Sequence, residues 1–435
     1  MELRAVRGMN DILPDEVVRW QRLEAAFRRH AELQGYAEVR TPLIEHTSLF
    51  RRQVGEATDI VEKEMYSFER HGDDLTVRPE GTAGAARAYV EHQMATKEPV
   101  SRWYYLGPMF RGERPAKGRY RQFYQAGCEL YGDPGPLCDA EVIDLVCGLL
   151  RDLGIDDFVV HVNSLGSGDT RDRYRDALLA HFTPRKDALS EDSQRRLDKN
   201  PLRILDSKDP RDREAAAGAP SILDVLDEAD RAHWHGLLRG LSALGIEHVV
   251  DPTLVRGLDY YTRTLFEVRA RSADLGAQNT LCGGGRYDNM VRSLGGPEVP
   301  AIGFAMGLER ILLSMPDTGA PPTPGAVLLP LTPEGATRAL VLARALRALG
   351  VRAEVDGRGG KLAKMLGRAE KRGAALCVIL GEELARGVVA VKDLAARTQE
   401  ELAVETAAAV IADRLAGRAL AQEGRAPAGT PRGSR

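Results

Sequence analysis

Residues 104–132 read YYLGPMFRGERPAKGRYRQFYQAGCELYG, and this stretch decides the fold of the chain. Two segments rich in aromatic and apolar residues, 101–111 and 122–131, flank a short basic loop, which predicts an antiparallel pair of strands. Successive side chains of a strand point to opposite faces, so the second strand divides into two sets. One set is typical of a core and consists of Tyr124, Ala126, Cys128 and Leu130.

The opposite face of this strand carries Phe123, Gln125, Gly127 and Glu129. A flat ring, an amide, a glycine and a carboxylate suit a ligand cleft, where the ring can stack and the polar groups can orient a bound molecule. A solvated edge strand explains the same alternation equally well. The pattern alone leaves these two interpretations open.

The loop between the strands is strongly basic. Its sequence GERPAKGRYR contains one acid, Glu113, and is preceded by Arg111. The basic residues of the loop are Arg114, Lys117, Arg119 and Arg121. Arginine forks suit phosphate oxygens, although a solvated hairpin tip is the usual role of such a loop.

Two further segments place arginine beside groups that suit a binding site. In LVRGLDYYTRTLFEV, residues 254–268, Arg256 precedes Tyr260 and Tyr261, which fit either a pocket or a core with satisfied hydroxyls. In AIGFAMGLERILL, residues 301–313, Arg310 falls in the first turn of an expected helix. A helix N-terminus with an arginine is a plausible polyphosphate seat, and it also occurs by chance in amphipathic helices.

The glycine-rich segments exclude the common nucleotide-binding loops. GGGRYDNM, residues 283–290, is interpreted as a turn and does not match G-x-G-x-x-G. GRGGKL, residues 357–362, has Leu362 where a P-loop requires Ser or Thr. If the protein uses ATP, it does so without a P-loop.

The length of 435 residues predicts two or three domains. Residues 1–320 form the expected first domain, within which 171–245 are charge-dense with helical periodicity and are interpreted as a helical insertion. The segment TGAPPTPG, residues 318–325, is the expected linker. Beyond it, strands alternating with helices over 325–416 predict a small α/β domain with a largely parallel sheet. The polar, Gly- and Pro-rich residues 417–435 are expected to be disordered.

Composition sets limits on partners and location. The net charge of −3 makes no case for nucleic-acid binding by the whole chain, so any RNA-binding surface must be local. Five cysteines without a C-x-x-C pair argue against a disulfide framework and against a cysteine-rich zinc site, and no protein motif for a metal is present. With neither a signal peptide nor a membrane-spanning run, we expect a cytoplasmic location and no membrane partner.

One candidate RNA surface lies beyond the linker. Basic residues recur along one side of an expected helix over 361–372, namely Lys361, Lys364, Arg368, Lys371 and Arg372. A solvated amphipathic face explains this pattern as well as RNA contact does.

These segments together resemble the class II aminoacyl-tRNA synthetases, and specifically the histidyl family, from RGMNDILPDE (7–16) to about residue 415. TPLIEHTSLF (41–50) is similar to the first class II motif, which builds the dimer interface, FRGERPAKGRYRQFYQAGCE (110–129) to the second and AIGFAMGLERILL to the third. LVRGLDYY and GGGRYD resemble the two histidine-specific segments. Five matches in the correct order make chance similarity very improbable.

The resemblance implies a fold, a reaction and its partners. The fold is an α+β catalytic domain, whose antiparallel sheet is flanked by helices and carries a helical insertion, followed by an α/β anticodon-binding domain. The reaction is ATP-dependent activation of L-histidine and its transfer to tRNA(His). ATP is a substrate, Mg²⁺ accompanies its phosphates, and the enzyme is a homodimer.

The resemblance also assigns residues. For catalysis it implies Arg111 and Arg256. For ATP it implies Arg111, Glu113, Arg119, Phe123 and Arg310. For histidine it implies Glu80, Thr82, Gln125, Glu129, Tyr260, Tyr261 and Tyr287. For tRNA the candidates are Arg114, Lys117, Arg121, Lys361, Lys364, Arg368 and Lys371.

Two other functions compete. One is a non-catalytic relative with the same fold, such as the regulatory subunit of ATP phosphoribosyltransferase, which senses histidine. Such relatives lack the C-terminal domain and lose active-site arginines, whereas this chain keeps Arg111, Arg256 and Arg310. The other is an ATP-dependent ligase for a different carboxylate, which leaves the basic helix unexplained.

Overall fold

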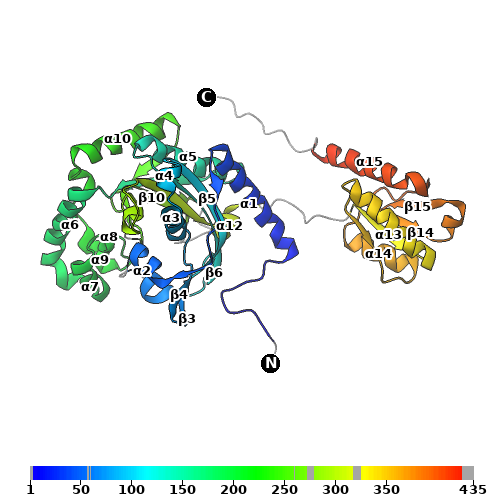
Figure 1. Ribbon diagram of the computed structural model, residues 1–435, viewed down its shortest axis with the longest axis horizontal. Coiled ribbons are helices and arrows are strands. Elements are labelled where there is room, and N and C mark those ends of the chain that lie inside the picture. The colour runs from blue at the N-terminus through cyan, green and yellow to red at the C-terminus, as the bar shows by residue number, and fades with distance from the viewer. Residues whose placement is uncertain are drawn as a thin grey trace. The chain divides into compact units, whose positions relative to one another are not determined.

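A computed structural model describes residues 3–55, 58, 60–258, 260–271, 279–316 and 325–423. The chain divides into two compact units, residues 1–319 and 320–435, and each is described by itself (Figure 1). All of the expected linker except Gly325 lies outside the described residues. None of the described helices combines the length and the hydropathy that crossing a lipid bilayer requires.

An eight-stranded sheet forms the centre of the first unit. In spatial order its strands are β1 (Ala37–Glu38), β5 (Ser101–Phe110), β6 (Gln122–Tyr131), β11 (Ala301–Gly307), β10 (Thr280–Arg286), β9 (Thr262–Ala270), β7 (Phe158–Ser164) and β8 (His248–Val250). The six central strands are antiparallel, as expected, and only the short edge strands β1 and β8 pair in parallel. The quoted hairpin is therefore β5–β6, and β11 covers its second edge.

Helices cover the two faces of this sheet unequally. One face packs against α1 (Pro14–Leu33), α5 (Pro136–Asp152), α10 (Glu228–Ala243) and α12 (Leu308–Ser314), and it contains the main apolar core. The other face carries α3 (Thr82–Glu91), α4 (Met94–Lys97) and α11 (Met290–Ser293). The set Ala126, Cys128 and Leu130 lies in the main core, as the alternation predicted.

A three-stranded sheet stands beside the large one. It comprises β2 (Ile44–His46), β4 (Asp73–Val77) and β3 (Tyr66–Arg70), with α2 (Thr47–Val54) and the π-helix η1 (Ile60–Glu64) packed nearby. The segment around Pro42 is thus divided between two sheets, because β1 belongs to the large sheet and β2 to the small one.

The charge-dense segment is helical, as expected (Figure 1). It contains α6 (Gly168–Phe182), η2 (Thr183–Ala188), α7 (Glu191–Lys199), α8 (Leu202–Leu205), α9 (Pro210–Ala216), η3 (Ile222–Asp224) and α10. Side chains of Ser190, Asp209 and Asp227 accept backbone N–H groups at the starts of α7, α9 and α10. Each cap satisfies one otherwise unpaired donor and fixes where the helix begins.

The glycines at 283–285 form part of strand β10 rather than the expected turn. They are glycines because their neighbours leave no room for side chains. A Cβ added at Gly284 would lie 2.4 Å from the carbonyl oxygen of Gly303 on β11. A turn was expected because glycine is usually a turn residue. Here the glycines instead allow neighbouring backbones to approach closely.

The second unit has a five-stranded sheet in the order β13 (Ala353–Val355), β12 (Ala326–Pro330), β14 (Leu376–Leu380), β15 (Val388–Asp393) and β16 (Gln399–Ala403). Its helical elements are α13 (Pro333–Ala348), α14 (Leu362–Lys371), η5 (Glu382–Arg386) and α15 (Val404–Glu423). The expectation of a largely parallel sheet holds for β13, β12 and β14 only. Strands β15 and β16 are antiparallel because a short loop joins them, which a parallel pair does not permit.

The expected disorder from residue 417 is wrong for its first part. Helix α15 continues to Glu423. Leu415 packs against the core of the second unit, and the Arg418 guanidinium forms an ion pair with Asp393. These contacts extend the helix into a polar sequence. Residues 424–435 lie outside the described part of the chain.

Candidate active site

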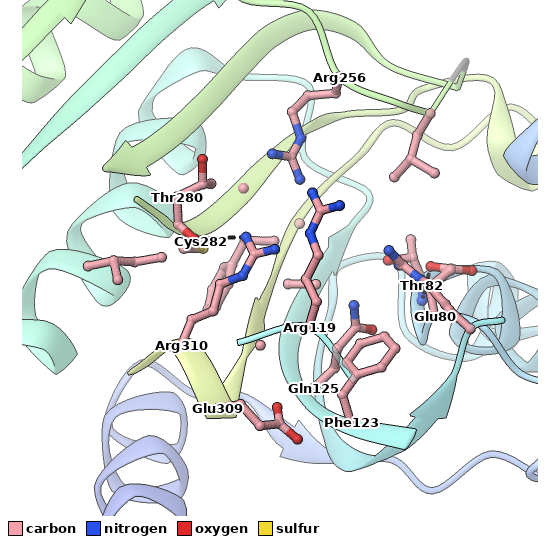
Figure 2. Close-up of a pocket in the computed structure, with 18 of the residues that line it drawn as sticks. Glu80, Thr82, Arg119, Phe123, Gln125, Arg256, Thr280, Cys282, Glu309 and Arg310 are labelled. Carbon is pink, nitrogen blue, oxygen red and sulfur yellow. Dashed lines mark hydrogen bonds between the residues drawn. The ribbon is translucent and has the colours of Figure 1, made fainter. Parts of the chain in front are cut away.

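A pocket opens on the face of the large sheet that carries α3 (Figure 2). The expected binding face of β6 contributes to it, so the cleft interpretation is favoured over the solvated edge strand. The pocket gathers twelve of the residues singled out from the sequence: Glu80, Thr82, Arg111, Glu113, Arg119, Phe123, Gln125, Arg256, Tyr260, Tyr261, Tyr287 and Arg310. Glu129 lies directly behind them, fully buried.

Three guanidinium groups from separate stretches of chain point into one end of the pocket. Arg119 comes from the hairpin loop, Arg256 from the loop before β9, and Arg310 from the first turn of α12 (Figure 2). Burial lowers the pKa of Arg310, and the neighbouring charges of Arg119 and Arg256 lower it further. A bound anion would relieve the repulsion among these charges, so this end of the pocket suits a polyphosphate.

Fixed contacts hold two of these arginines. Arg310 donates from Nη1 to the carbonyl oxygen of Thr280 at 3.1 Å. Arg256 donates to the carboxylate of Glu267, whose other oxygen accepts Arg269 Nε at 2.7 Å. Glu267 therefore lies between the guanidinium groups of Arg256 and Arg269 and orients that of Arg256.

Gly283 makes the position of Arg256 possible. A Cβ on Gly283 would lie 2.5 Å from Cζ of Arg256, so any side chain would displace the guanidinium. This close approach explains why β10 carries glycine at a position where the strand has ordinary backbone angles.

Arg111 and Phe123 form a flat platform at the middle of the pocket. The Cζ atom of Arg111 lies 5.2 Å from the centroid of the Phe123 ring, within cation–π range. Arg111 Nε donates to the carbonyl oxygen of Pro79 at 2.9 Å, which fixes the plane of the guanidinium. Burial lowers the pKa of Arg111. A planar ring with a cation beside it suits a nucleobase with an attached phosphate.

The start of α3 supplies polar groups to the other end. The Glu80 carboxylate accepts the backbone N–H groups of Thr82 at 2.8 Å and Ala83 at 2.9 Å, so it caps the helix from inside the pocket. Burial raises the pKa of Glu80. The buried Oε1 atom of Gln125 has no hydrogen-bond partner among the described residues. An unpaired buried acceptor is costly, so it indicates a ligand donor at this place.

Glu129 is surrounded by tyrosine side chains. Its carboxylate accepts the Tyr105 hydroxyl at 3.1 Å and also the Tyr287 hydroxyl. Burial raises the pKa of Glu129 to about 8. The Tyr260 ring centroid lies 4.7 Å from that of Tyr261 and 5.6 Å from that of Tyr287. The result is a small aromatic cavity with one acidic group at its base.

The sequence pattern missed several lining or supporting residues. Tyr105 joins Glu129 to Thr82, whose Oγ1 lies 3.3 Å from the tyrosine hydroxyl. Strand alternation could have found Tyr105, because it shares a face of β5 with Gly107. Glu309 follows from no pattern, and its carboxylate turns away from the arginines to accept the N–H of Tyr124 at 2.9 Å (Figure 2).

The candidate RNA-binding residues lie elsewhere. Arg114, Lys117 and Arg121 belong to the hairpin loop but do not line the pocket. Among the basic residues of α14 and its flanks, Arg368 is paired with Asp356 at 2.7 Å and Arg372 with Glu354 at 2.8 Å. Lys361, Lys364 and Lys371 are exposed. These three lysines make up the more available positive surface of α14.

The described residues contain no group of three His, Cys, Asp or Glu side chains arranged to hold a metal ion.

Residues 8–311 match the family model for histidyl-tRNA synthetase, and residues 326–414 match that of the anticodon binding domain. A histidine–tRNA ligase of Sorangium cellulosum is 70% identical over 436 residues, with 100% of both chains covered. One of Picosynechococcus is 47% identical over 405 residues, covering 92% of this chain and 95% of the relative.

Solved structures agree. Apo histidyl-tRNA synthetase of S. aureus superposes with a TM-score of 0.81 at 32% identity, covering 94% of this chain and 100% of that one. A Bacillus halodurans structure described as an ATP phosphoribosyltransferase regulatory subunit/histidyl-tRNA synthetase has a TM-score of 0.62 at 23% identity, covering 85% and 97%, which shows the shared fold alone. With a family match over most of the chain and relatives at high identity, the chain belongs to the histidyl-tRNA synthetase family.

Proposed function

We propose that this pocket activates L-histidine with ATP and passes it to the 3′ end of tRNA(His). Family membership assigns the overall activity, the charging of tRNA with histidine. The observation that carries the assignment to this pocket is the convergence of Arg119, Arg256 and Arg310 next to the acidic aromatic cavity of Glu129. One end suits a triphosphate and the other an imidazole.

Histidine occupies the end of the pocket near α3. Its ammonium group binds Glu80, the Thr82 hydroxyl and the unpaired Oε1 of Gln125. A neutral imidazole has one N–H donor and one lone pair, so Glu129 accepts the donor and Tyr261 donates to the acceptor. The aromatic walls are Tyr260 and Tyr287. A site built from paired hydrogen bonds rejects analogues that lack them by as much as ~10⁴–10⁵, because its own buried groups would be left unpaired.

ATP lies across the platform and the arginine cluster. Its adenine stacks on Phe123 and contacts Glu113, Arg111 holds the α-phosphate, and Arg119 and Arg310 hold the outer phosphates. Arg256 bridges the histidine carboxylate and the α-phosphate. These fixed charges offset the repulsion between two anions and stabilise the charge that builds up in the transition state.

The reaction has two steps. A carboxylate oxygen of histidine attacks the α-phosphorus, the bond to the bridging oxygen breaks, and pyrophosphate leaves with its electron pair. The terminal ribose hydroxyl of the tRNA then attacks the carbonyl carbon of the adenylate, loses its proton, and expels AMP. The protein forms no covalent bond, so positioning and electrostatics dominate.

Three finer properties belong to the same proposal. Mg²⁺ would bind with the phosphates of ATP and would supply neutralising charge there. The chain forms a homodimer through the segment of the first motif, where the apolar side chains of Leu43 and Ile44 are more than two-fifths exposed, as is that of Phe68 on the same small sheet. The cytoplasm is the proposed location, and the five buried, unpaired thiols suit its reducing conditions.

Amino-acid-dependent exchange of pyrophosphate into ATP tests the proposal. Measured with a panel of amino acids, exchange is expected with histidine alone, followed by transfer to tRNA(His). Absence of exchange would favour a histidine sensor, and exchange driven by another carboxylate would favour the other ligase. Either result would overturn the assignment.

A further inference from the structure

Strand β9 carries a bulge immediately after the tyrosine pair Tyr260–Tyr261. Opposite β10, Gly285 pairs with Leu265, but the next residue, Arg286, pairs with Thr262, so that two residues of β9, Arg263 and Thr264, are extra. Bulges of this kind re-aim neighbouring side chains and are frequent next to active sites. The bulge lies between the tyrosines of the aromatic cavity and the rest of strand β9.

The backbone of the bulge is strained, so contacts with surrounding residues must stabilise it. Arg263 has φ +45°, in the left-handed region that non-glycine residues seldom adopt. Such a conformation persists only when the surrounding structure over-determines it. The backbone of Arg263 is fixed at both ends, because its N–H donates to the oxygen of Gly166 at 2.8 Å and its oxygen accepts the N–H of Leu165 at 2.7 Å.

Asp230 on α10 holds the side chain of the same residue. Its carboxylate, 1% exposed, accepts Arg263 Nε at 2.9 Å, and it also accepts the backbone N–H of Ser167 at 2.8 Å and the Ser167 hydroxyl at 2.7 Å. Asp230 thus ties the bulge and the 165–167 loop to one helix.

His233, one turn further along α10, holds the second bulge residue. Its Nε2 lies 2.8 Å from Oδ2 of Asp139 and 3.3 Å from Oγ1 of Thr264, and the Thr264 hydroxyl also donates to Asp139. Asp139, fully buried, accepts Arg286 Nε at 3.0 Å and Arg286 Nη2 at 2.7 Å. Arg286 immediately precedes Tyr287, which forms one wall of the aromatic cavity. The hydrogen-bond network of Asp139 therefore extends to that wall.

We propose that Asp230 and His233 of α10 are positioning residues for histidine: they hold the bulge at Arg263–Thr264 in place and so fix the positions of Tyr261 and Tyr287 in the pocket. This rests on the proposed function of those tyrosines. Neither α10 residue lines the pocket, and both act through Arg263 and Thr264 on the neighbouring tyrosines, which do line it. A hydrogen-bonding site needs its groups held to within about half an ångström, which explains why such a costly buried network stands behind it.

The network predicts a selective kinetic effect. Thr264→Val keeps the shape of the side chain and removes the hydroxyl, and His233→Leu removes the ring donor. Each is expected to raise the KM for histidine in pyrophosphate exchange roughly ten-fold, the effect of one lost hydrogen bond, with the KM for ATP within about two-fold of the parent. The conservative variants Thr264→Ser and His233→Gln retain a polar hydrogen and are expected to restore most of the histidine affinity.

A control variant on the same helix separates positioning from stability. Leu241→Val removes one methylene from a fully buried, apolar position of α10. It is expected to lower Tm and to leave the ratio of the two KM values unchanged. If Thr264→Val and His233→Leu instead raise both KM values equally, or if the Ser and Gln variants behave like them, the inference is overturned.

The variant Tyr261→Phe shows whether a negative result contradicts the positioning role or the proposed histidine site itself. An increased KM for histidine in Tyr261→Phe, together with unchanged kinetics in Thr264→Val and His233→Leu, contradicts the positioning role alone. Unchanged kinetics in Tyr261→Phe contradict the proposed histidine site and remove the basis of the inference with it.

Discussion

Arg256, which lines the pocket, forms an ion pair with Glu267 behind it, and Nε of Arg256 is buried with no hydrogen-bond partner among the described residues. One side of the guanidinium is thus held by the protein while the other is left for a ligand. Such an arrangement is set before substrates bind, so little reorganisation is needed at the moment of reaction.

Arg256→Ala is expected to reduce histidine-dependent pyrophosphate exchange by about 10²–10³, the usual cost of removing one fixed charge at a developing anion. Arg256→Lys is expected to recover little, because an ammonium cannot bridge two anions while also holding Glu267. Arg195→Ala, at an exposed position of α7, serves as the control with parental activity. Near-normal exchange in Arg256→Ala would refute the bridging role.

Glu129→Gln is expected to raise the KM for histidine sharply. The amide retains the shape of the side chain, but one of its two terminal groups is a fixed donor, which conflicts with the donor that the imidazole presents. The KM for ATP should remain close to the parental value because the platform of Arg111 and Phe123 is unchanged. Steady-state exchange at varied histidine and then varied ATP measures both, and an unaltered histidine KM would contradict the assignment.

The raised pKa of the Glu129 carboxyl predicts that the stability of the protein without bound ligand depends on pH. Burial raises the pKa of Glu129 from 4.5 to about 8, so between these pH values the folded protein keeps a proton that the unfolded chain has lost. The free energy of unfolding therefore falls as pH rises through this window. Glu129→Gln has no such group, so its stability relative to the parent should rise with pH, by an amount on the order of a few kcal/mol at most. Denaturant unfolding at pH 5 and pH 8 measures the difference, and a difference independent of pH would argue against the shifted carboxyl.

Gly283→Ala should lower exchange activity nearly as much as loss of Arg256, since the new Cβ would lie 2.5 Å from the guanidinium carbon. Gly148→Ala on α5 is the matched control, because the nearest atom to its Cβ is on His30 at 3.6 Å, an ordinary contact. Comparing kcat/KM and Tm for the two variants distinguishes displacement of the arginine from general destabilisation. Parental kcat/KM in Gly283→Ala would mean that Arg256 needs no fixed position.

Charge removal on α14 tests the RNA surface. The triple variant Lys361→Gln, Lys364→Gln, Lys371→Gln is expected to weaken tRNA binding and to flatten its salt dependence, by roughly 0.7–0.9 in log–log slope for each lysine that contacts a phosphate. Arg372→Gln should change the slope less because Glu354 already neutralises this arginine. An unchanged slope in the triple variant would place the RNA contacts elsewhere.

The sequence allowed prediction of those features that depend on local alternation. The two faces of β6 followed from strand periodicity, and the grouping of Phe123 and Gln125 in one pocket confirms this part of the prediction. The helical character of the insertion and the basic side of α14 followed in the same way.

Features that depend on contacts between distant parts of the chain could not be predicted from such patterns. The glycines at 283–285 were expected in a turn, because nothing local reveals that Arg256 and Gly303 occupy the space beside them. The pairing of Glu267 with Arg256 and the contact of α10 with the bulge at Arg263 also depend on tertiary packing. Nor does the local sequence reveal that Arg418 of α15 pairs with Asp393 on a strand of the same unit.

The strand order of the large sheet has a consequence for the nascent chain. Strand β6 ends at Tyr131, yet the neighbour that covers its second edge, β11, begins only at Ala301. At ribosomal rates of roughly 5–20 residues per second, the backbone donors and acceptors of that edge have no final partner for many seconds. Unpaired edges attract foreign strands, so shielding during translation, by a chaperone or by early folding of the insertion, should govern how much active protein a cell obtains.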